Sequence, residues 1–173
     1  MKHPILIACA LMILWGYSAY ALPTKIKVEN TVWHAVGKSS LNFLFLDVYD
    51  IALYSENGRY DAALPYMLII QYHREFSAGD IIDRSLSEMD MQSPLSEKKE
   101  ALFHSYLKRV IPRVVKQDVI RAKMIPRIGI EFQVNNATPT LINDNDFAAR
   151  FFDIWLGKKT SEPELRTLLL HEG

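Results

Sequence analysis

The chain has 173 residues, with 20 acidic and 20 basic side chains and 49% hydrophobic residues. This balance is typical of one folded domain and excludes an intrinsically disordered chain. The formal net charge of zero gives no indication of a broad electrostatic attraction to nucleic acid or anionic lipid.

The first 21 residues have the pattern of a secretory signal peptide. Residues 4–15 are almost all apolar, and Ala19 and Ala21 supply the small side chains that signal peptidase requires. The apolar run is shorter than the roughly 20 residues that cross a bilayer. We therefore expect cleavage after Ala21 and a mature, periplasmic domain of residues 22–173. The alternative is an uncleaved membrane anchor.

Cys9 is the only cysteine in the chain. The residues around it loosely resemble a lipoprotein box, but the apolar stretch before it is too short for lipidation. The mature domain would have no cysteine, and hence no disulfide, thiolate metal site or cysteine nucleophile. Such a domain can still bury enough surface to fold without a disulfide.

The first half of the mature chain is expected to form strands. Residues 32–36 predict a short strand ended by Gly37, and Asn57-Gly58 predicts a turn. Residues 43–54 are apolar at both alternating positions, which is typical of a central strand covered on both faces. Residues 66–72 predict a second buried strand.

Two helices are expected next. Ser77 is a candidate N-cap with Asp80 three residues later, and Ser93-Pro94 is a candidate start for the second helix. The second helix would bury an apolar stripe and end at Pro112. The stripe consists of Leu102, Phe103, Tyr106, Leu107 and Val110.

Strands are then expected at residues 118–124 and 128–134, followed by a turn at Asn135-Asn136 and a short strand through Leu141. The last part is helical. Asn143 or Asp144 would cap a helix that buries Phe147, Phe151, Phe152 and Trp155 and stops at Gly157, and Ser161 with Glu164 would form the capping box of a final helix. The predicted fold class is α+β, an antiparallel sheet with helices packed on one face.

Two longer motifs stand near the two ends of the mature chain, Gly37–Tyr54 (GKSSLNFLFLDVYDIALY) and Asp146–Leu170 (DFAARFFDIWLGKKTSEPELRTLLL). They resemble the opening and the closing motif of the bacterial exported chalcone isomerase-like proteins. Between them, Tyr72–Arg74 and Ser85–Met89 lie where the family has a strand end and its first helix. The resemblance implies an open-faced β-sandwich with a hydrophobic cleft between sheet and helices.

The resemblance also implies two possible kinds of function, because this fold serves chalcone isomerase and plastid proteins that bind fatty acids. The arginine of the plant isomerase lies just before the central strand, where this chain offers only Lys38, and lysine lacks a planar bidentate donor. The position of its catalytic threonine falls at Tyr49. No catalytic residue is assigned here, and fold alone does not decide function.

The candidate ligand-binding residues are Tyr49, Arg74, Asp47, Lys38 and Tyr54. Asp47 and Tyr49 share one face of the expected central strand, and a polar group at a cleft mouth would fix a ligand head group. Tyr49 is the first candidate for that contact and Arg74 the second. The alternatives are a structural carboxylate, paired with Arg74 or Arg84, and tyrosines that only pack the core.

The sequence supports neither a cofactor nor a metal. The histidines show no i, i+3 or i+4 pairing, the serines lack a nucleophile-elbow frame, and no glycine-rich loop is present to hold a phosphate. No nucleic-acid partner is expected.

Three hypotheses remain. The first is a non-catalytic domain that holds a hydrophobic, fatty-acid-like molecule between sheet and helices. The second is an isomerase or lyase of an unsaturated carbonyl compound, which requires Lys38 or Arg74 to converge with Tyr49 on one pocket. The third is an envelope module that binds a protein partner through an exposed apolar patch.

Overall fold

The computed structural model describes residues 22–171, so the predicted signal peptide lies outside the described residues. Seven strands and four helices follow one another along this part of the chain. The strands are β1 (Lys25–Val28), β2 (Thr31–Phe43), β3 (Leu46–Ser55), β4 (Tyr66–Tyr72), β5 (Val119–Ile125), β6 (Gly129–Val134) and β7 (Thr140–Ile142). The helices are α1 (Ala78–Gln92), α2 (Glu97–Val110), α3 (Asn145–Leu156) and α4 (Pro163–Leu170).

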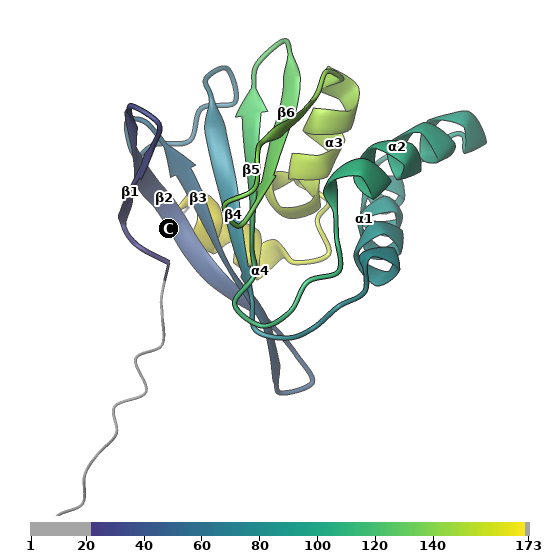
Figure 1. Ribbon diagram of the computed structural model, residues 1–173, viewed down its shortest axis with the longest axis horizontal. Coiled ribbons are helices and arrows are strands. Elements are labelled where there is room, and N and C mark those ends of the chain that lie inside the picture. The colour runs from purple at the N-terminus through teal and green to yellow at the C-terminus, as the bar shows by residue number, and fades with distance from the viewer. Residues whose placement is uncertain (1–21, 172–173) are drawn as a thin grey trace, which may run out of the picture.

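The seven strands form one antiparallel sheet in the order β1-β2-β3-β4-β5-β6-β7, so each strand pairs with its neighbours in the chain. Helices α1 and α2 are inserted between β4 and β5, and α3 and α4 follow β7 (Figure 1). All four helices contribute side chains to one core on one face of the sheet. The predicted α+β architecture, with an antiparallel sheet and helices on one face, is confirmed.

The main core lies between the sheet and the helices. Alternate residues of the central strands, such as Ile51 and Leu53, are fully buried there. Aromatic side chains of the sheet pack against α3, as Tyr66 does against Phe152 and Phe132 against Phe151. The aromatic residues predicted to be buried are all in this core: Phe147, Phe151, Phe152 and Trp155. Their spacing of three to four residues places them along one stripe of the helix, which the sheet covers.

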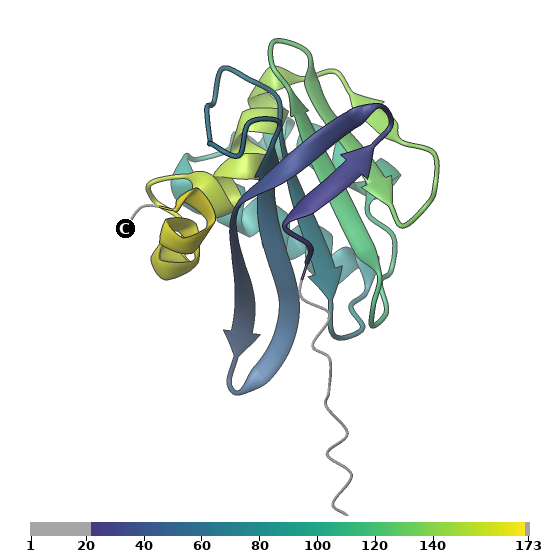
Figure 2. The ribbon, with the colours of Figure 1, turned by 90° about the vertical axis from the view of Figure 1, so that its left-hand side faces the viewer.

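A second, smaller core covers the outer face of the sheet. It contains Leu22, Trp33, Ala52, Tyr54, Met67 and Ile69. Figure 2 shows why these residues are buried, because β1 and the start of β2 curl across the outer face. The central part of β3 is therefore covered on both sides, as the sequence predicts.

The structure corrects two strand boundaries. The strand predicted for residues 32–36 continues through Gly37 to Phe43, with an irregular register between Ala35 and Gly37. The strand predicted for residues 43–54 starts only at Leu46, because Leu44 and Phe45 form a hairpin turn with positive φ angles of 47° and 66°. Turns are usually recognised in a sequence by glycine, asparagine, aspartate or proline, so two apolar residues gave no indication of a turn here.

Two helix starts also differ from prediction. Helix α2 is capped by Ser96, whose hydroxyl accepts from the Lys99 amide, and not by Ser93. Helix α4 starts after Glu162, with Pro163 in its first turn and no side-chain cap. The caps at Ser77 and Asp144 and the stop at Gly157 are confirmed.

Candidate functional site

A cavity of about 270 Å³ lies between the sheet and the helices. Its walls come from strands β2 to β5, helices α1 and α3, and the chain segments beside them. Most of the lining side chains are apolar: Leu41, Val48, Ile70, Tyr72, Phe76, Ile81, Ile111, Ile120, Phe151, Ile154 and Trp155. An open apolar space in the middle of a packed domain is the usual form of a site for a hydrophobic small molecule.

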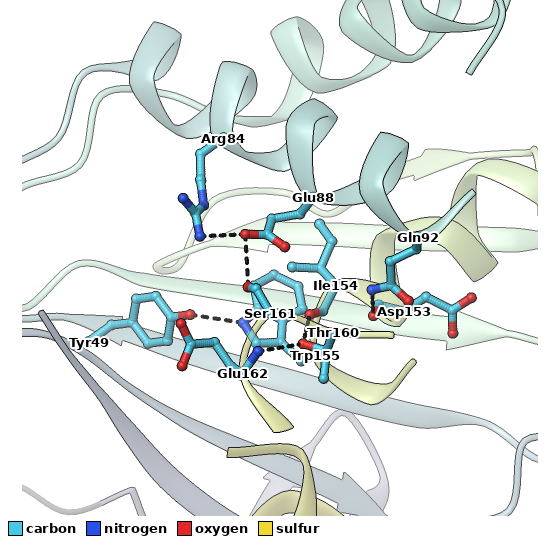
Figure 3. A network of polar contacts seen from close by, with 10 residues as sticks. All are labelled: Tyr49, Arg84, Glu88, Gln92, Asp153, Ile154, Trp155, Thr160, Ser161 and Glu162. Atoms are coloured by element: carbon cyan, nitrogen blue, oxygen red, sulfur yellow. Dashed lines mark hydrogen bonds and ion pairs between the residues drawn. The ribbon is translucent and has the colours of Figure 1, made fainter. Parts of the chain in front are cut away.

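Polar side chains gather on one side of this cavity, where α1 approaches the connection between α3 and α4 (Figure 3). Arg84 and Glu88 come from α1, Ser161 and Glu162 from that connection, and Tyr49 from β3. We call these five residues the polar cluster.

Glu88 is the centre of the polar cluster. It is only 3% exposed, and its Oε1 atom accepts from the hydroxyl of Ser161 at 2.9 Å and pairs with the Arg84 guanidinium. Its other oxygen, Oε2, is buried and has no hydrogen-bond partner among the described residues. Leaving a buried polar atom unpaired costs free energy, so this oxygen is a natural acceptor for a donor group inside the cavity.

Arg84 differs from Glu88 in its exposure. Its side chain is 67% exposed, so the guanidinium lies at the edge of the cavity, where it meets both solvent and the buried carboxylate. A guanidinium carries five N–H donors, and the contact with Glu88 leaves donors free for a second partner. The spacing of four residues on α1 brings Arg84 and Glu88 together on one face of that helix.

Tyr49 and Trp155 meet on the cavity wall. The indole Nε1 of Trp155 donates to the Tyr49 hydroxyl oxygen at 2.9 Å, as the dashed line in Figure 3 marks. No acceptor for the Tyr49 proton is found between residues 22 and 171. Burial raises the pKa of Tyr49 to about 12, so the phenol stays protonated and can donate at neutral pH.

The connection that carries Ser161 is itself fixed by hydrogen bonds. The hydroxyl of Thr160 donates to the Ile154 carbonyl at 2.6 Å and accepts from the Glu162 amide at 3.2 Å. Thr160 is buried, so water does not compete with these bonds. The segment therefore presents Ser161 and Glu162 to the cavity in a defined position.

Of the five residues predicted to bind a ligand, Tyr49 lines the cavity. Asp47 and Arg74 are exposed and do not line it. Lys38 donates to the Leu22 carbonyl at 2.6 Å, and Tyr54 donates to the Pro23 carbonyl at 2.7 Å. These last two bonds lie at the outer face of the sheet, where Leu22 and Tyr54 belong to the smaller core.

The structure thus does not bring Lys38 or Arg74 together with Tyr49. Neither carboxylate of strand β3, Asp47 or Asp50, forms an ion pair with Arg74 or Arg84 within residues 22–171. Asp50 lies 3.0 Å from the His73 ring nitrogen and accepts from the hydroxyl of Ser40 at 2.6 Å.

The site residues that sequence reasoning missed are Arg84, Glu88, Trp155, Ser161 and Glu162. One signal was available for the first two. They stand four residues apart on α1, directly beside the buried positions Ser85 and Met89. Such i,i+4 pairs of opposite charges are common on amphipathic helices, so the pattern alone does not predict a site.

Two absences apply to residues 22–171. No group of three or more histidine, cysteine or acidic side chains there is placed to hold a metal ion. In the same part of the chain, no helix has the length and apolar character needed to cross a membrane.

A crystal structure with a similar fold is that of a fatty-acid binding protein from Arabidopsis thaliana. Its TM-score is 0.61, with 12% sequence identity over 86% of this chain and 90% of that chain. A search of curated proteins found no match. The sequence itself matches the model of the chalcone isomerase-like family over residues 17–171. That match spans almost the whole chain, and the observed sheet and helices are those the resemblance implies, so the protein belongs to the chalcone isomerase-like family.

Proposed function

We propose that this protein binds a hydrophobic small molecule with one polar end in the cavity and does not catalyse a reaction on it. The observation that carries the proposal is the arrangement of the cavity, whose walls are mainly apolar and whose polar lining consists of the polar cluster together with Asp80 and Ser85 of α1. An amphiphile would bury its apolar part against the walls and direct its head group to Arg84 and Tyr49.

A fatty acid is the first candidate ligand. Its carboxylate would accept from the free N–H donors of Arg84 and from the Tyr49 hydroxyl, which stays protonated because its pKa is raised to about 12. The similar fold of a protein named for fatty-acid binding supports the same class of ligand. A fatty alcohol is the comparison ligand, because its hydroxyl would donate to the unpaired Glu88 Oε2 atom.

The size of the cavity limits the ligand. Its volume of about 270 Å³ is slightly below the range of roughly 300–1,000 Å³ that is usual for small-molecule sites. We expect a medium-length chain to be held completely, and a longer chain to leave one end outside.

The direct test is native mass spectrometry of the mature protein, purified from the periplasm of the producing cells. A bound mass that organic extraction removes, and that returns on titration with a medium-chain fatty acid, supports the proposal. A protein that carries no ligand and gains none on titration with fatty acids or fatty alcohols contradicts it.

Arg84→Gln tests the head-group contact. We expect it to weaken fatty-acid binding about tenfold, since a charged hydrogen bond is lost, and to change fatty-alcohol binding little. Arg74→Gln is the matched control, because Arg74 is an exposed arginine outside the cavity. Equal affinities of the two variants for fatty acid would remove Arg84 from the proposed site.

The isomerase hypothesis depends on Lys38 or Arg74 acting with Tyr49. Because Lys38 holds the Leu22 carbonyl and Arg74 does not line the cavity, the geometry gives that hypothesis no support. An enzymatic role therefore has no assigned catalytic group.

The proposed place of action is the periplasm. Support comes from the apolar run at residues 4–15 and the small residues Ala19 and Ala21. Export of the full chain in a bacterial host, followed by intact-mass measurement, tests this proposal. A periplasmic product that starts at Leu22 supports it, and a full-length product retained in the cytoplasm contradicts it.

A further inference from the structure

The tip of the β2–β3 hairpin is an exposed run of four apolar residues, Phe43 to Leu46. Phe45 is fully exposed (104%), Leu44 is 73% exposed and Phe43 is 65% exposed. Figure 2 shows this hairpin projecting beyond the rest of the sheet. Single exposed apolar residues are ordinary, but four in a row on a projecting tip indicate a surface that something covers.

The backbone conformation of the tip does not suit its apolar residues. Leu44 and Phe45 have φ angles of 47° and 66°, a conformation that favours glycine or asparagine. A hairpin turn with positive φ at both central residues normally carries Asn-Gly or Asp-Gly. Here it carries two bulky apolar residues, which make the turn less favourable and add only apolar surface.

Two other loops lie at the same end of the molecule, close to the hairpin. The His73 amide donates to the Val48 carbonyl at 2.9 Å, and the Gln117 amide donates to the Tyr72 carbonyl at 2.8 Å. These bonds hold the loops that follow β4 and α2 beside the base of the hairpin, as Figure 1 also shows.

These loops contribute exposed positive charges. Arg74 and Lys116 are both exposed, and neither has an ion-pair partner within residues 22–171. Exposed acidic residues lie at the same end, because Asp47 is next to the tip and Glu75 follows Arg74 and pairs with Arg113, so this end of the molecule has little net charge. An apolar tip with basic residues set back from it matches the layers of a lipid surface, hydrocarbon first and phosphate above it.

The cavity described above begins directly behind the tip. Leu41 and Val48 line its wall, two residues from Phe43 and from Leu46 respectively. The exposed tip and the apolar cavity are thus joined by a short stretch of the same two strands.

We propose that the tip, residues 43–46, inserts into the surface of a lipid bilayer, while Arg74 and Lys116 contact lipid phosphates. A bilayer can surround a projecting tip from every side without a matching groove, which suits four exposed side chains at a convex turn. Docking in this way would bring the cavity wall formed by Leu41 and Val48 toward the membrane.

Vesicle flotation of the mature protein tests the proposal. The vesicles contain phosphatidylethanolamine and phosphatidylglycerol, with pure phosphatidylcholine as comparison. We expect flotation with both compositions, because the apolar tip and not the net charge drives insertion. Phe45→Ser should lower the affinity about tenfold or more, because the ring that would enter the bilayer is lost. Leu102→Ser, which removes a partly exposed leucine from α2, is the matched control and should float like the unaltered protein.

A second variant separates docking from folding. Leu44→Asn with Phe45→Gly gives the turn its preferred residues, so we expect thermal stability to rise while flotation is lost. Fatty-acid binding in solution should be unchanged, so this proposal and the proposed function can fail independently. A protein that does not float, or a double variant that floats unchanged, would each overturn the proposal.

Discussion

Trp155 and Tyr49, 106 positions apart in the chain, are joined by a hydrogen bond of 2.9 Å from the indole Nε1 to the phenol oxygen. The bond connects helix α3 to strand β3 at the wall of the cavity. It fixes the orientation of the tyrosine, and it leaves the phenol proton available to a ligand. The same contact therefore serves both the stability of the domain and the geometry of the proposed site.

The first prediction concerns this bond. Tyr49→Phe removes the acceptor of a buried indole N–H, and we expect a loss of about 1–3 kcal/mol in the free energy of unfolding. Urea denaturation followed by circular dichroism measures the loss. Tyr72→Phe is the control, because Tyr72 lines the same cavity and its hydroxyl has no hydrogen-bond partner among the described residues. A loss in Tyr72→Phe as large as in Tyr49→Phe would contradict a special role of the bond.

The second prediction concerns pH. Burial raises the pKa of Tyr49 and Tyr54 from 10.0 to about 12, and it raises the pKa of Tyr72 further. A raised pKa means that the folded protein holds the phenol proton more tightly than the unfolded chain does. The free energy of unfolding therefore keeps its full value below pH 10, and it falls as the pH rises from 10 toward 12 and beyond.

Urea unfolding at a series of pH values, with tyrosinate absorbance recorded in parallel, tests the pH prediction. Above pH 10, each buried tyrosine should lower the free energy of unfolding by about 1.4 kcal/mol per pH unit. Tyr72→Phe should reduce this slope by the contribution of one group. A slope that Tyr72→Phe leaves unchanged would show that other groups cause the alkaline unfolding.

The third prediction concerns Gly37, where α4 touches strand β2. A Cβ atom at this position would lie 2.1 Å from the Leu168 carbonyl oxygen and 2.4 Å from that of Leu169. Both are backbone atoms, so Gly37→Ala must push α4 away from the sheet, at a cost of about 1–3 kcal/mol or more. Gly79→Ala is the control, because its nearest neighbour would be 3.7 Å away and alanine favours the helix. Thermal melting of both variants tests the contrast, and equal melting temperatures would refute it.

The fourth prediction concerns the start of the described chain. Lys38 and Tyr54 donate hydrogen bonds to the carbonyls of Leu22 and Pro23. The double variant Lys38→Met with Tyr54→Phe removes both bonds and should loosen residues 22–28. Hydrogen exchange in that segment should become faster, because two of its anchors are lost. Ligand binding should not change, since both bonds lie away from the cavity. Weaker ligand binding in this variant would instead support the sequence-based assignment of Lys38 and Tyr54 to the site.

Most of the fold could be predicted because its elements show clear periodicity or clear end signals. Strand β4 was placed at its observed bounds, Tyr66–Tyr72, because a run of that length that is apolar except for Gln71 suits a strand covered on both faces. Helix α3 carries its aromatic residues at helical spacing between Asp144 and Gly157, which cap its two ends. The errors arose where tertiary contacts override local signals. Gly37 reads as a strand end, yet its glycine is explained by the close approach of α4.

The site could be predicted only in part. Tyr49 was predicted because it is a polar residue in an apolar strand, and the structure places it in the cavity wall. Arg74 was predicted as a ligand contact and Arg84 only as an ion-pair partner, because the sequence does not show which of the two arginines meets the cavity. The unpaired Glu88 Oε2 atom depends on how α1 packs against the connection between α3 and α4, and no local sequence pattern reports such packing.

The order of the strands has a consequence for the speed of folding. Five of the six strand pairings join strands that follow one another through short connections, so forming them costs little conformational entropy. The pairing of β4 with β5 differs, because α1 and α2 lie between these strands in the chain. Closing that long connection unites the two halves of the sheet beneath the helices. We therefore expect contacts between Leu68 and Ala122, which face each other across this junction, to set the folding rate more than any hairpin does.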